Sequence, residues 1–409
     1  MNPLSLLLDQ APASITGAVL RRIDARLRAE MLQMPSRVGE AAGAYLIAHG
    51  NADERIRLVE NPGATPEMLA ELAYDPDPRI AAGVFGNPAS PREARLRVLP
   101  RIVAATPLDE LLYSELDHRQ IRRRDALFER VCVLVESEDP RVVTRAFERL
   151  AEHGAKRQWL SGVLLRGCLS LLRAAGPAAV TAALPHVLPQ VTGSQSDKVA
   201  AALDEPTDAA LVTRALDEFT SVPAVAARLR EEKNLPGAAA MLLAPRGPLD
   251  WDLIVREHRV RPLSVYVRMA LAGQLGCPAE LRAYLPARAS QDHPISEWVD
   301  AAPATRRLLG SPRFNDRSNA DIMSAHTDGT LSAAVILGHG APAGNALRAL
   351  DQRDAERYAD TRTALRALTE PALGDDTEAW VVALALLPDF TGPLPHLLLA
   401  AGAITDPRG

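Results

Sequence analysis

Apolar runs separated by short polar breaks recur along much of the chain, and the clearest example lies between residues 55 and 99. Each of two apolar runs there is followed by a break that begins with Asn-Pro and then by a second apolar segment with helical spacing. Asn61 and Asn87 are 26 positions apart, and Pro66 and Pro91 are 25 apart. The common period predicts a repeat of two short helices per unit. The copies read RIRLVENPGATPEMLAEL at 55–72 and RIAAGVFGNPASPREARLRVL at 79–99.

The breaks contain residues that end one helix and begin the next. Pro cannot continue a helix, and Asn61 and Asn87 are expected in the left-handed conformation that often follows the last helical residue. Thr65 and Ser90 each precede a Pro, which predicts a capping hydroxyl followed by Pro at the first helical position. We therefore expect the second helix of each copy to begin at the Pro of its Thr-Pro or Ser-Pro pair.

The punctuation of residues 61–91, NPGATPEMLAELAYDPDPRIAAGVFGNPASP, resembles that of the leucine-rich repeat variant family. The resemblance covers about residues 51–100 and implies alternating helices of two kinds stacked into a superhelix. Founding members of that family carry an iron–sulfur module ahead of the repeats. The three cysteines of this chain lie far apart, so no such cluster is expected here.

Weaker copies of the pattern follow toward the carboxyl end. Each shows an apolar run, a Gly or Pro break and a second apolar helix. These copies lie at 238–254, 267–285, 331–350 and 379–399, with a further break expected in RRLLGSPRF at 306–314. The second helices are expected to begin near Pro248, Pro278, Pro342 and Pro393.

The middle of the chain, about 101–235, lacks the Asn-Pro signal but keeps helical periodicity. Asp139-Pro140 precedes an i, i+4, i+7 apolar stripe, which predicts a HEAT-like helix ending near Gly154. GSQSD at 193–197 is the best linker candidate, and no stretch shows sustained strand alternation. The stripe comprises Val143, Phe147 and Leu150.

Together these patterns predict an all-α protein, an α-solenoid of short helical repeats of the leucine-rich-repeat-variant and HEAT-like kind. Five consecutive segments are expected. They are an amino-terminal helical cap at 1–50, leucine-rich-repeat-variant-like repeats at 51–100, HEAT-like hairpins at 101–192, a linker with helices at 193–235, and degenerate repeats at 236–409.

Composition supports short helices. The chain is 47% hydrophobic but only 4% aromatic, so Ala, Leu and Val supply the apolar mass, and 32 Pro with 25 Gly suit many short helices joined by turns. With a formal net charge of −5, the chain lacks the excess of basic residues that is typical of nucleic-acid-binding proteins.

Cysteine usage and the apolar runs indicate a cytoplasmic, reducing location. Cys132, Cys168 and Cys277 form no CxxC pair, so we expect buried thiols outside any disulfide or zinc site. Residues 1–30 lack the features of a secretory signal, and no apolar run reaches the roughly 20 residues of a membrane span.

Candidate chemistry is sparse, and no catalytic, cofactor-binding or metal-binding residue is predicted. Gly338 to Gly344 superficially resembles a phosphate loop, but its spacing is GxGxxxG with an internal Pro, which favours a break between two helices. The nine histidines are scattered and form no HExxH or similar ligand pair. A second alternative function is an enzyme with an unrecognised site between repeats.

One basic cluster offers a first alternative. Arg119, Arg122 and Arg123 would share a helix face able to contact nucleic-acid phosphates, although a solvated face paired with nearby acidic residues is the favoured interpretation. No aromatic residue interleaves to stack on bases. The cluster comprises His118, Arg119, Arg122, Arg123, Arg124 and Arg130.

The leading hypothesis is a non-enzymatic scaffold that presents an extended solenoid surface to a protein or peptide partner. Exposed aromatic and arginine residues are the usual anchors of such surfaces, which makes Trp251, Trp298 and Trp380 candidates. A lone Trp in an apolar helix more often packs in the core, so no site residue is assigned.

Overall fold

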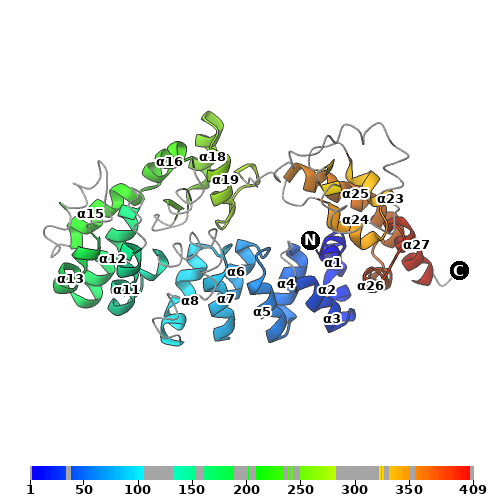
Figure 1. Ribbon diagram of the computed structural model, residues 1–409, viewed down its shortest axis with the longest axis horizontal. Coiled ribbons are helices and arrows are strands. Elements are labelled where there is room, and N and C mark those ends of the chain that lie inside the picture. Colours follow the sequence, from blue (N-terminus) through cyan, green and yellow to red (C-terminus); the bar gives the residue numbers. More distant parts are fainter. Residues whose placement is uncertain are drawn as a thin grey trace. The chain divides into compact units, whose positions relative to one another are not determined.

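Every regular element in the described part of the chain is a helix, so the expected all-α class is confirmed there (Figure 1). Twenty α-helices and one short 3-10 helix have both their bounds within these stretches, which contain no strand. No helix in them is long and apolar enough to cross a membrane. The computed structural model describes residues 2–33, 38–105, 132–152, 160–187, 201, 209–233, 238, 241–242, 249–281, 322–323, 325–326, 331–350 and 355–405.

The chain folds into two compact units. The terminal unit comprises residues 1–68 together with 284–409, so it contains both ends of the chain, and the middle unit comprises residues 69–283. The chain therefore leaves the terminal unit once and returns to it after about 215 residues. The five consecutive segments expected from the sequence remain a prediction.

The amino-terminal part of the terminal unit contains five short helices. Helix α2 packs against α4, α3 packs against α5, and α4 packs against α5. Together with the contact between α1 and α3, this means that each of these five helices packs against at least one other of the five. The helices are α1 (Pro3–Leu8), α2 (Ala13–Arg22), α3 (Ala25–Gln33), α4 (Glu40–His49) and α5 (Ala52–Glu60).

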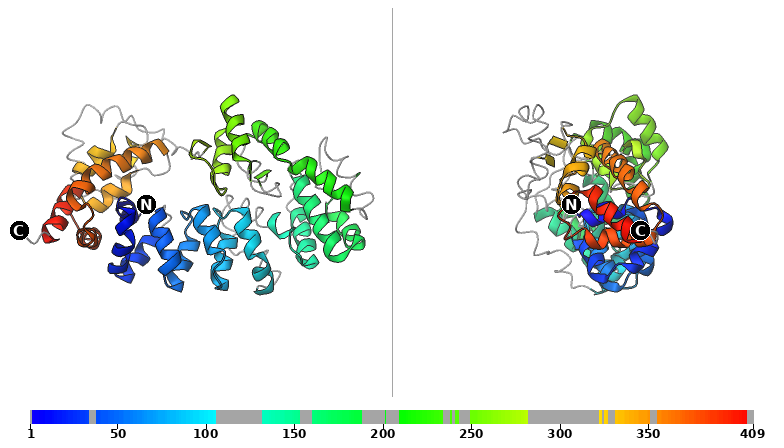
Figure 2. Two further views of the ribbon diagram at one scale, coloured as in Figure 1. Left: turned by 180° about the vertical axis from the view of Figure 1, so that it is seen from behind. Right: turned by 90° about the vertical axis from the view of Figure 1, so that its right-hand side faces the viewer.

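In the described carboxyl-terminal part of the same unit, α27 packs against α23, α24, α25 and α26. Helix α1 packs against α24 and α26, and α2 packs against α26. The blue amino-terminal helices accordingly lie beside the orange and red ones in each view (Figures 1 and 2). These helices are α23 (Ala333–His339), α24 (Ala343–Ala349), α25 (Ala355–Leu373), α26 (Thr377–Leu386) and α27 (Leu394–Thr405).

The middle unit begins within α6 (Pro66–Leu72), and its helices mostly pack against near neighbours in sequence. Helix α7 packs against α8, α12 packs against α11, α13 and α15, and α16 packs against α15 and α18. The elements after α6 are α7 (Pro78–Gly86), α8 (Arg92–Ala105), α11 (Pro140–Glu152), α12 (Leu160–Ala175), α13 (Pro177–Val187), α15 (Ala209–Thr220), α16 (Val222–Glu231), α18 (Trp251–Val260), α19 (Val265–Ala272) and the 3-10 helix η3 (Ala279–Leu281).

The repeated Asn-Pro turn has one geometry in both copies, and it differs from the expected one. Asn61 and Asn87 follow α5 and α7 in extended backbone, with φ of −72° and −68°, so the expected left-handed conformation is wrong. Each precedes a Pro, which restricts the residue before it to extended conformations. Their side chains form the turn instead, because Oδ1 accepts the backbone N–H of Gly63 or Ala89 at 2.8 Å.

The two copies differ in how the second helix begins. Helix α6 starts at Pro66 as expected, and the Thr65 hydroxyl accepts the Met68 N–H at 3.3 Å. Helix α8 starts one residue later than expected, at Arg92. The Ser90 hydroxyl is therefore one position too early to cap it and is buried with no hydrogen-bond partner among the described residues, so that cap prediction is wrong.

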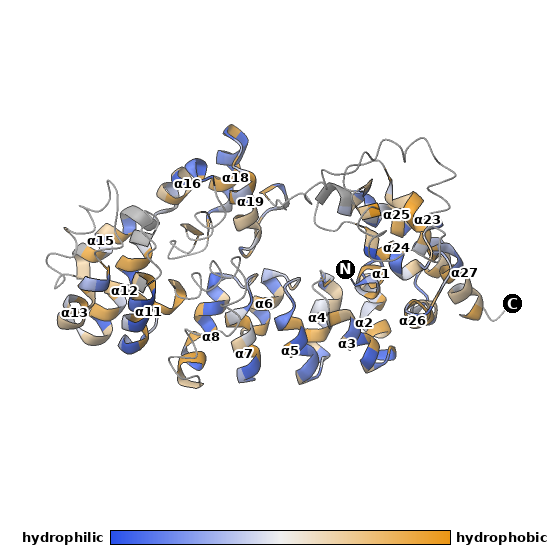
Figure 3. Cartoon of the chain, in the orientation of Figure 1, coloured by the Kyte–Doolittle hydropathy of each residue, from blue (hydrophilic) through white to orange (hydrophobic). Residues whose placement is uncertain are grey.

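Helices α7 and α11 begin in the same way although they are 62 residues apart. Asp77 and Asp139 each accept the backbone N–H of an arginine two residues later and pair with its guanidinium. In both helices the residues three, four, seven and eight positions after the Asp are buried. The helix predicted after Asp139 is thereby confirmed as α11, which ends at Glu152. It contains both hydrophilic and hydrophobic residues (Figure 3). Its predicted stripe of Val143, Phe147 and Leu150 is buried.

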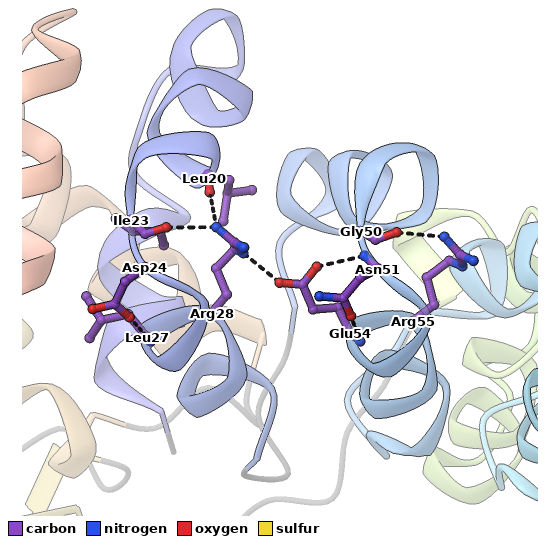
Figure 4. A network of polar contacts seen from close by, with 9 residues as sticks. All are labelled: Leu20, Ile23, Asp24, Leu27, Arg28, Gly50, Asn51, Glu54 and Arg55. Carbon is purple, nitrogen blue, oxygen red and sulfur yellow. Dashed lines mark hydrogen bonds and ion pairs between the residues drawn. The ribbon is translucent and has the colours of Figure 1, made fainter.

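A polar latch joins the successive pairs α2–α3 and α4–α5 (Figure 4). The Arg28 guanidinium donates to the carbonyl oxygens of Leu20 and Ile23 at 2.9 and 2.7 Å, where α2 ends. It also pairs with Glu54 of α5 at 2.6 Å. Glu54 in turn accepts the N–H of Asn51 and completes a capping box at the start of α5. One arginine thus connects the end of one helix to the beginning of another.

The other predicted breaks agree with the structure where it describes them. Pro342 precedes α24 and Pro393 precedes α27, as expected, while Pro278 precedes the 3-10 helix η3, after which this described stretch ends. Pro248, the break within 306–314 and the linker candidate at 193–197 lie outside the described residues.

Candidate interaction surface

Tyr74 is an exposed aromatic residue in the turn two residues after the end of α6, with 68% of its surface accessible. The guanidinium carbon of Arg97, on α8, lies 4.0 Å from the centroid of its ring. Arg101, one turn further along α8, donates to the carbonyl oxygens of Ala73 and Asp75. Two arginines from one helix face therefore hold both the side chain of Tyr74 and the backbone on either side of it.

The local sequence explains why Tyr74 faces outward. Leu72 and Ala73 are buried, so the next side chain of the turn lies on the opposite side. The Tyr74 N–H donates to the Glu71 carbonyl at 3.1 Å, which closes the turn. Asp75 then accepts the N–H of Asp77 at 2.9 Å and leads the chain into α7. Hydrogen bonds therefore fix the backbone conformation before and after Tyr74.

A buried ion cluster fixes the helix that carries the two arginines. Arg92 of α8 donates to Glu136 with an Nε–Oε1 distance of 3.3 Å, and Arg166 of α12 lies 3.2 Å from the same oxygen. All three side chains are largely buried. Because two guanidinium groups share one carboxylate, removing Glu136 would leave buried charge without its counter-charge. The cluster ties α8 to α12 and so supports the position of Arg97.

The tryptophans named from the sequence do not form this surface. Trp380 is 1% exposed, and its indole N–H donates to the Gly374 carbonyl at 3.0 Å, so it is a core residue and its candidacy as a surface anchor is wrong. Trp251 is partly buried and packs against the core around Ile254 and Val267. Trp298 lies outside the described residues.

Sequence reasoning missed Tyr74 because its partners are remote. Arg97 and Arg101 lie 23 and 27 positions further along the chain, and no local pattern joins them to a tyrosine. The signal available in the sequence is the repeat itself, since it places α6 and α8 as equivalent second helices of successive units.

Two other candidates named from the sequence were a possible phosphate loop and a basic cluster. Gly338 to Gly344 connects α23 and α24, so the predicted break between helices is confirmed. A Cβ at Gly340 would lie 2.5 Å from the Ile336 carbonyl oxygen and 2.7 Å from the Ala346 Cβ, so close packing of the two helices accounts for this glycine. The basic cluster from His118 to Arg130 lies outside the described residues.

The three cysteines are buried thiols outside any disulfide, as predicted. Burial raises the pKa of Cys168 to about 12, which keeps its thiol protonated and unreactive at neutral pH. No group of three His, Cys, Asp or Glu residues able to hold a metal ion occurs among the described residues.

Comparison with known proteins does not extend the resemblance noted in the sequence. No family model, no curated protein and no solved structure matches this chain. The likeness to the leucine-rich repeat variant therefore rests on the sequence of residues 51–100 alone. Any function has to be argued from the residues themselves.

Proposed function

We propose that this protein is a non-enzymatic scaffold, built as a solenoid of short helical repeats, that binds a protein partner through the Tyr74–Arg97 surface. The recurring Asn-Pro turns and the equivalent starts of α7 and α11 support a repeat architecture. Stacked repeats present the same helix of successive units to a partner, and α6 and α8 are such helices.

The observation that carries the proposal is an exposed aromatic side chain that is already held in place. Tyr and Arg are enriched among the residues that dominate binding free energy at protein interfaces. Ordering a mobile side chain costs about 0.5–1.5 kcal/mol on binding, and Tyr74 has been ordered in advance by Arg97. One ring face is covered by the guanidinium, while most of the tyrosine surface stays accessible.

The test is affinity capture with the whole chain as bait, comparing Tyr74→Ala and Arg97→Ala with Val260→Ala. Val260 is 79% exposed in the same unit, so its substitution controls for loss of exposed apolar surface. Partners captured by the parent chain should bind the first two variants about tenfold more weakly or worse, and the control equally well. Circular dichroism checks that all three variants remain folded.

Equal binding by Tyr74→Ala would reject this surface as the contact. Capture that disappears after nuclease treatment and weakens steeply with salt would instead support the nucleic-acid alternative based on residues 118–130.

We further propose a cytoplasmic location. All three cysteines are buried thiols and none is in a disulfide, which is the usual state in a reducing compartment. Fractionation of host cells with detection of the tagged chain would check it, and recovery from an oxidising compartment would contradict it.

A further inference from the structure

The amino-terminal helix α1 is apolar and buried on every side. All six residues from Pro3 to Leu8 are buried, and its four leucines are at most 3% exposed. A helix of this kind needs cover from several neighbours, and its neighbours are α3, α24 and α26. Two of these three helices come from the carboxyl-terminal end of the chain.

Polar contacts at the edge of this packing also join the two ends of the chain. The Tyr358 hydroxyl of α25 donates to the Asp9 carboxylate at 2.8 Å, directly after α1, across 349 positions of sequence. Arg22, the last residue of α2, forms an ion pair with Glu378 of α26. We call the whole set of contacts between residues 2–33 and residues 331–405 the terminal clasp.

The terminal clasp resembles an interface between subunits in its construction, with an apolar centre and a polar edge. Its two halves are connected covalently through residues 34–330, a stretch that includes α4, α5 and the whole middle unit. Every copy of the chain therefore carries one complete amino-terminal half and one complete carboxyl-terminal half. The halves of two copies carry the same complementary side chains as the two halves of one copy.

We infer that the terminal clasp exchanges between copies, so that residues 2–33 of one chain pack on α24–α26 of a second and form a swapped dimer. An open clasp exposes the four leucines of α1 to water, so the open chain is a poor resting state. Closure within one chain and exchange between two chains both bury these leucines. The balance between them is set by chain concentration and by the entropy of connecting the halves.

Single cysteine variants test exchange directly. Arg22→Cys and Glu378→Cys introduce thiols at two exposed positions that are in contact across the clasp, whereas the three native cysteines are buried. The two variants are mixed at high concentration, brought through mild denaturant to open the clasp, returned to buffer and treated with a short bismaleimide. Exchange predicts covalent dimers containing one copy of each variant, with a linked peptide pair spanning positions 22 and 378.

Three controls make the result decisive. Arg22→Cys mixed with Leu399→Cys, exposed at 66% on α27 of the same unit, should give far fewer dimers. A chain that carries both Arg22→Cys and Glu378→Cys should, at low concentration, be cross-linked within itself. Leu7→Asp in the Glu378→Cys chain alone should still permit exchange, because the Arg22→Cys chain supplies an intact α1. Leu7→Asp in both chains should abolish the dimers.

Exchange is overturned if the double variant links within one chain while the mixture gives no dimers at any concentration. It is equally overturned if dimers persist undiminished when both chains carry Leu7→Asp, because association would then use another surface.

Discussion

His258 accepts a hydrogen bond that only its neutral form can accept. Its Nδ1 receives the backbone N–H of Leu263 at 3.0 Å, where the chain turns from α18 toward α19. Desolvation and then the nearby Arg268 guanidinium lower the pKa of His258, while Glu280 opposes them. The turn is therefore organised around an uncharged imidazole with its proton on Nε2.

This arrangement predicts acid sensitivity in the middle unit. Because the folded-state pKa lies below the ordinary 6.5, the contribution of His258 to stability is complete above 6.5 and is lost as pH falls through the folded pKa. Denaturant unfolding followed by Trp fluorescence should show a smaller loss of stability between about pH 7 and about pH 5 for His258→Gln than for the parent. An identical loss in both proteins would show that other groups cause the sensitivity.

Residue-scale detail of this kind is only partly predictable from sequence. The Asn-Pro turns were expected because Asn and Pro act on adjacent residues, yet their conformation was predicted wrongly, since the restriction imposed by the following Pro outweighs the tolerance of Asn for positive φ. The contacts of Arg97 and Arg101 with Tyr74 and its neighbours were not predictable, because these arginines lie two helices further along the chain.

At the scale of elements, the latch between Arg28 and Glu54 combines two separable functions. Glu54 completes the capping box of α5 through Asn51, and it pairs with Arg28 between the two helix pairs. Glutamine can fulfil the capping function but carries no charge for the arginine. The two functions can therefore be distinguished by substitution.

We expect Glu54→Gln to lower the free energy of unfolding by about 1–2 kcal/mol and Glu54→Ala to lower it further, by about another 1 kcal/mol. Glu60, an exposed acid of the same helix, provides the control, and Glu60→Ala should change stability by less than about 0.5 kcal/mol. Thermal and denaturant unfolding measure all three variants. Equal effects of glutamine and alanine at position 54 would mean that only the pairing with Arg28 matters.

The helix starts at Pro66 and after Asp139 were predicted correctly, whereas the predicted Ser90 cap does not form. Asp77 and Asp139 begin helices with the same buried register, and Asp376, which caps α26, repeats it. Counted from Asp376, Trp380 lies four positions on, at a buried position, so its burial follows from the register once the cap is known. Naming it as a surface candidate failed because the residue type was considered without that register.

At the scale of the whole molecule, the terminal clasp is the feature that sequence patterns could not predict. Residues 1–50 were expected to cap the array, and their packing on helices more than 300 positions away leaves no periodic signal. Repeat architecture usually confines contacts to neighbouring units, so local punctuation specifies the helices but not the association of the two ends.

The clasp makes the carboxyl-terminal helices depend on a residue near the amino terminus. Leu7 is fully buried in α1, and Leu7→Ala should cost about 2–5 kcal/mol through lost burial and a residual cavity. Hydrogen exchange measured by mass spectrometry should quicken in α24 and α26 while α11–α13 of the middle unit keep their protection. Leu134→Ala, at an equally buried position of the middle unit, should produce the converse pattern. Faster hydrogen exchange confined to residues 2–33 would instead mean that the carboxyl-terminal helices remain folded without α1.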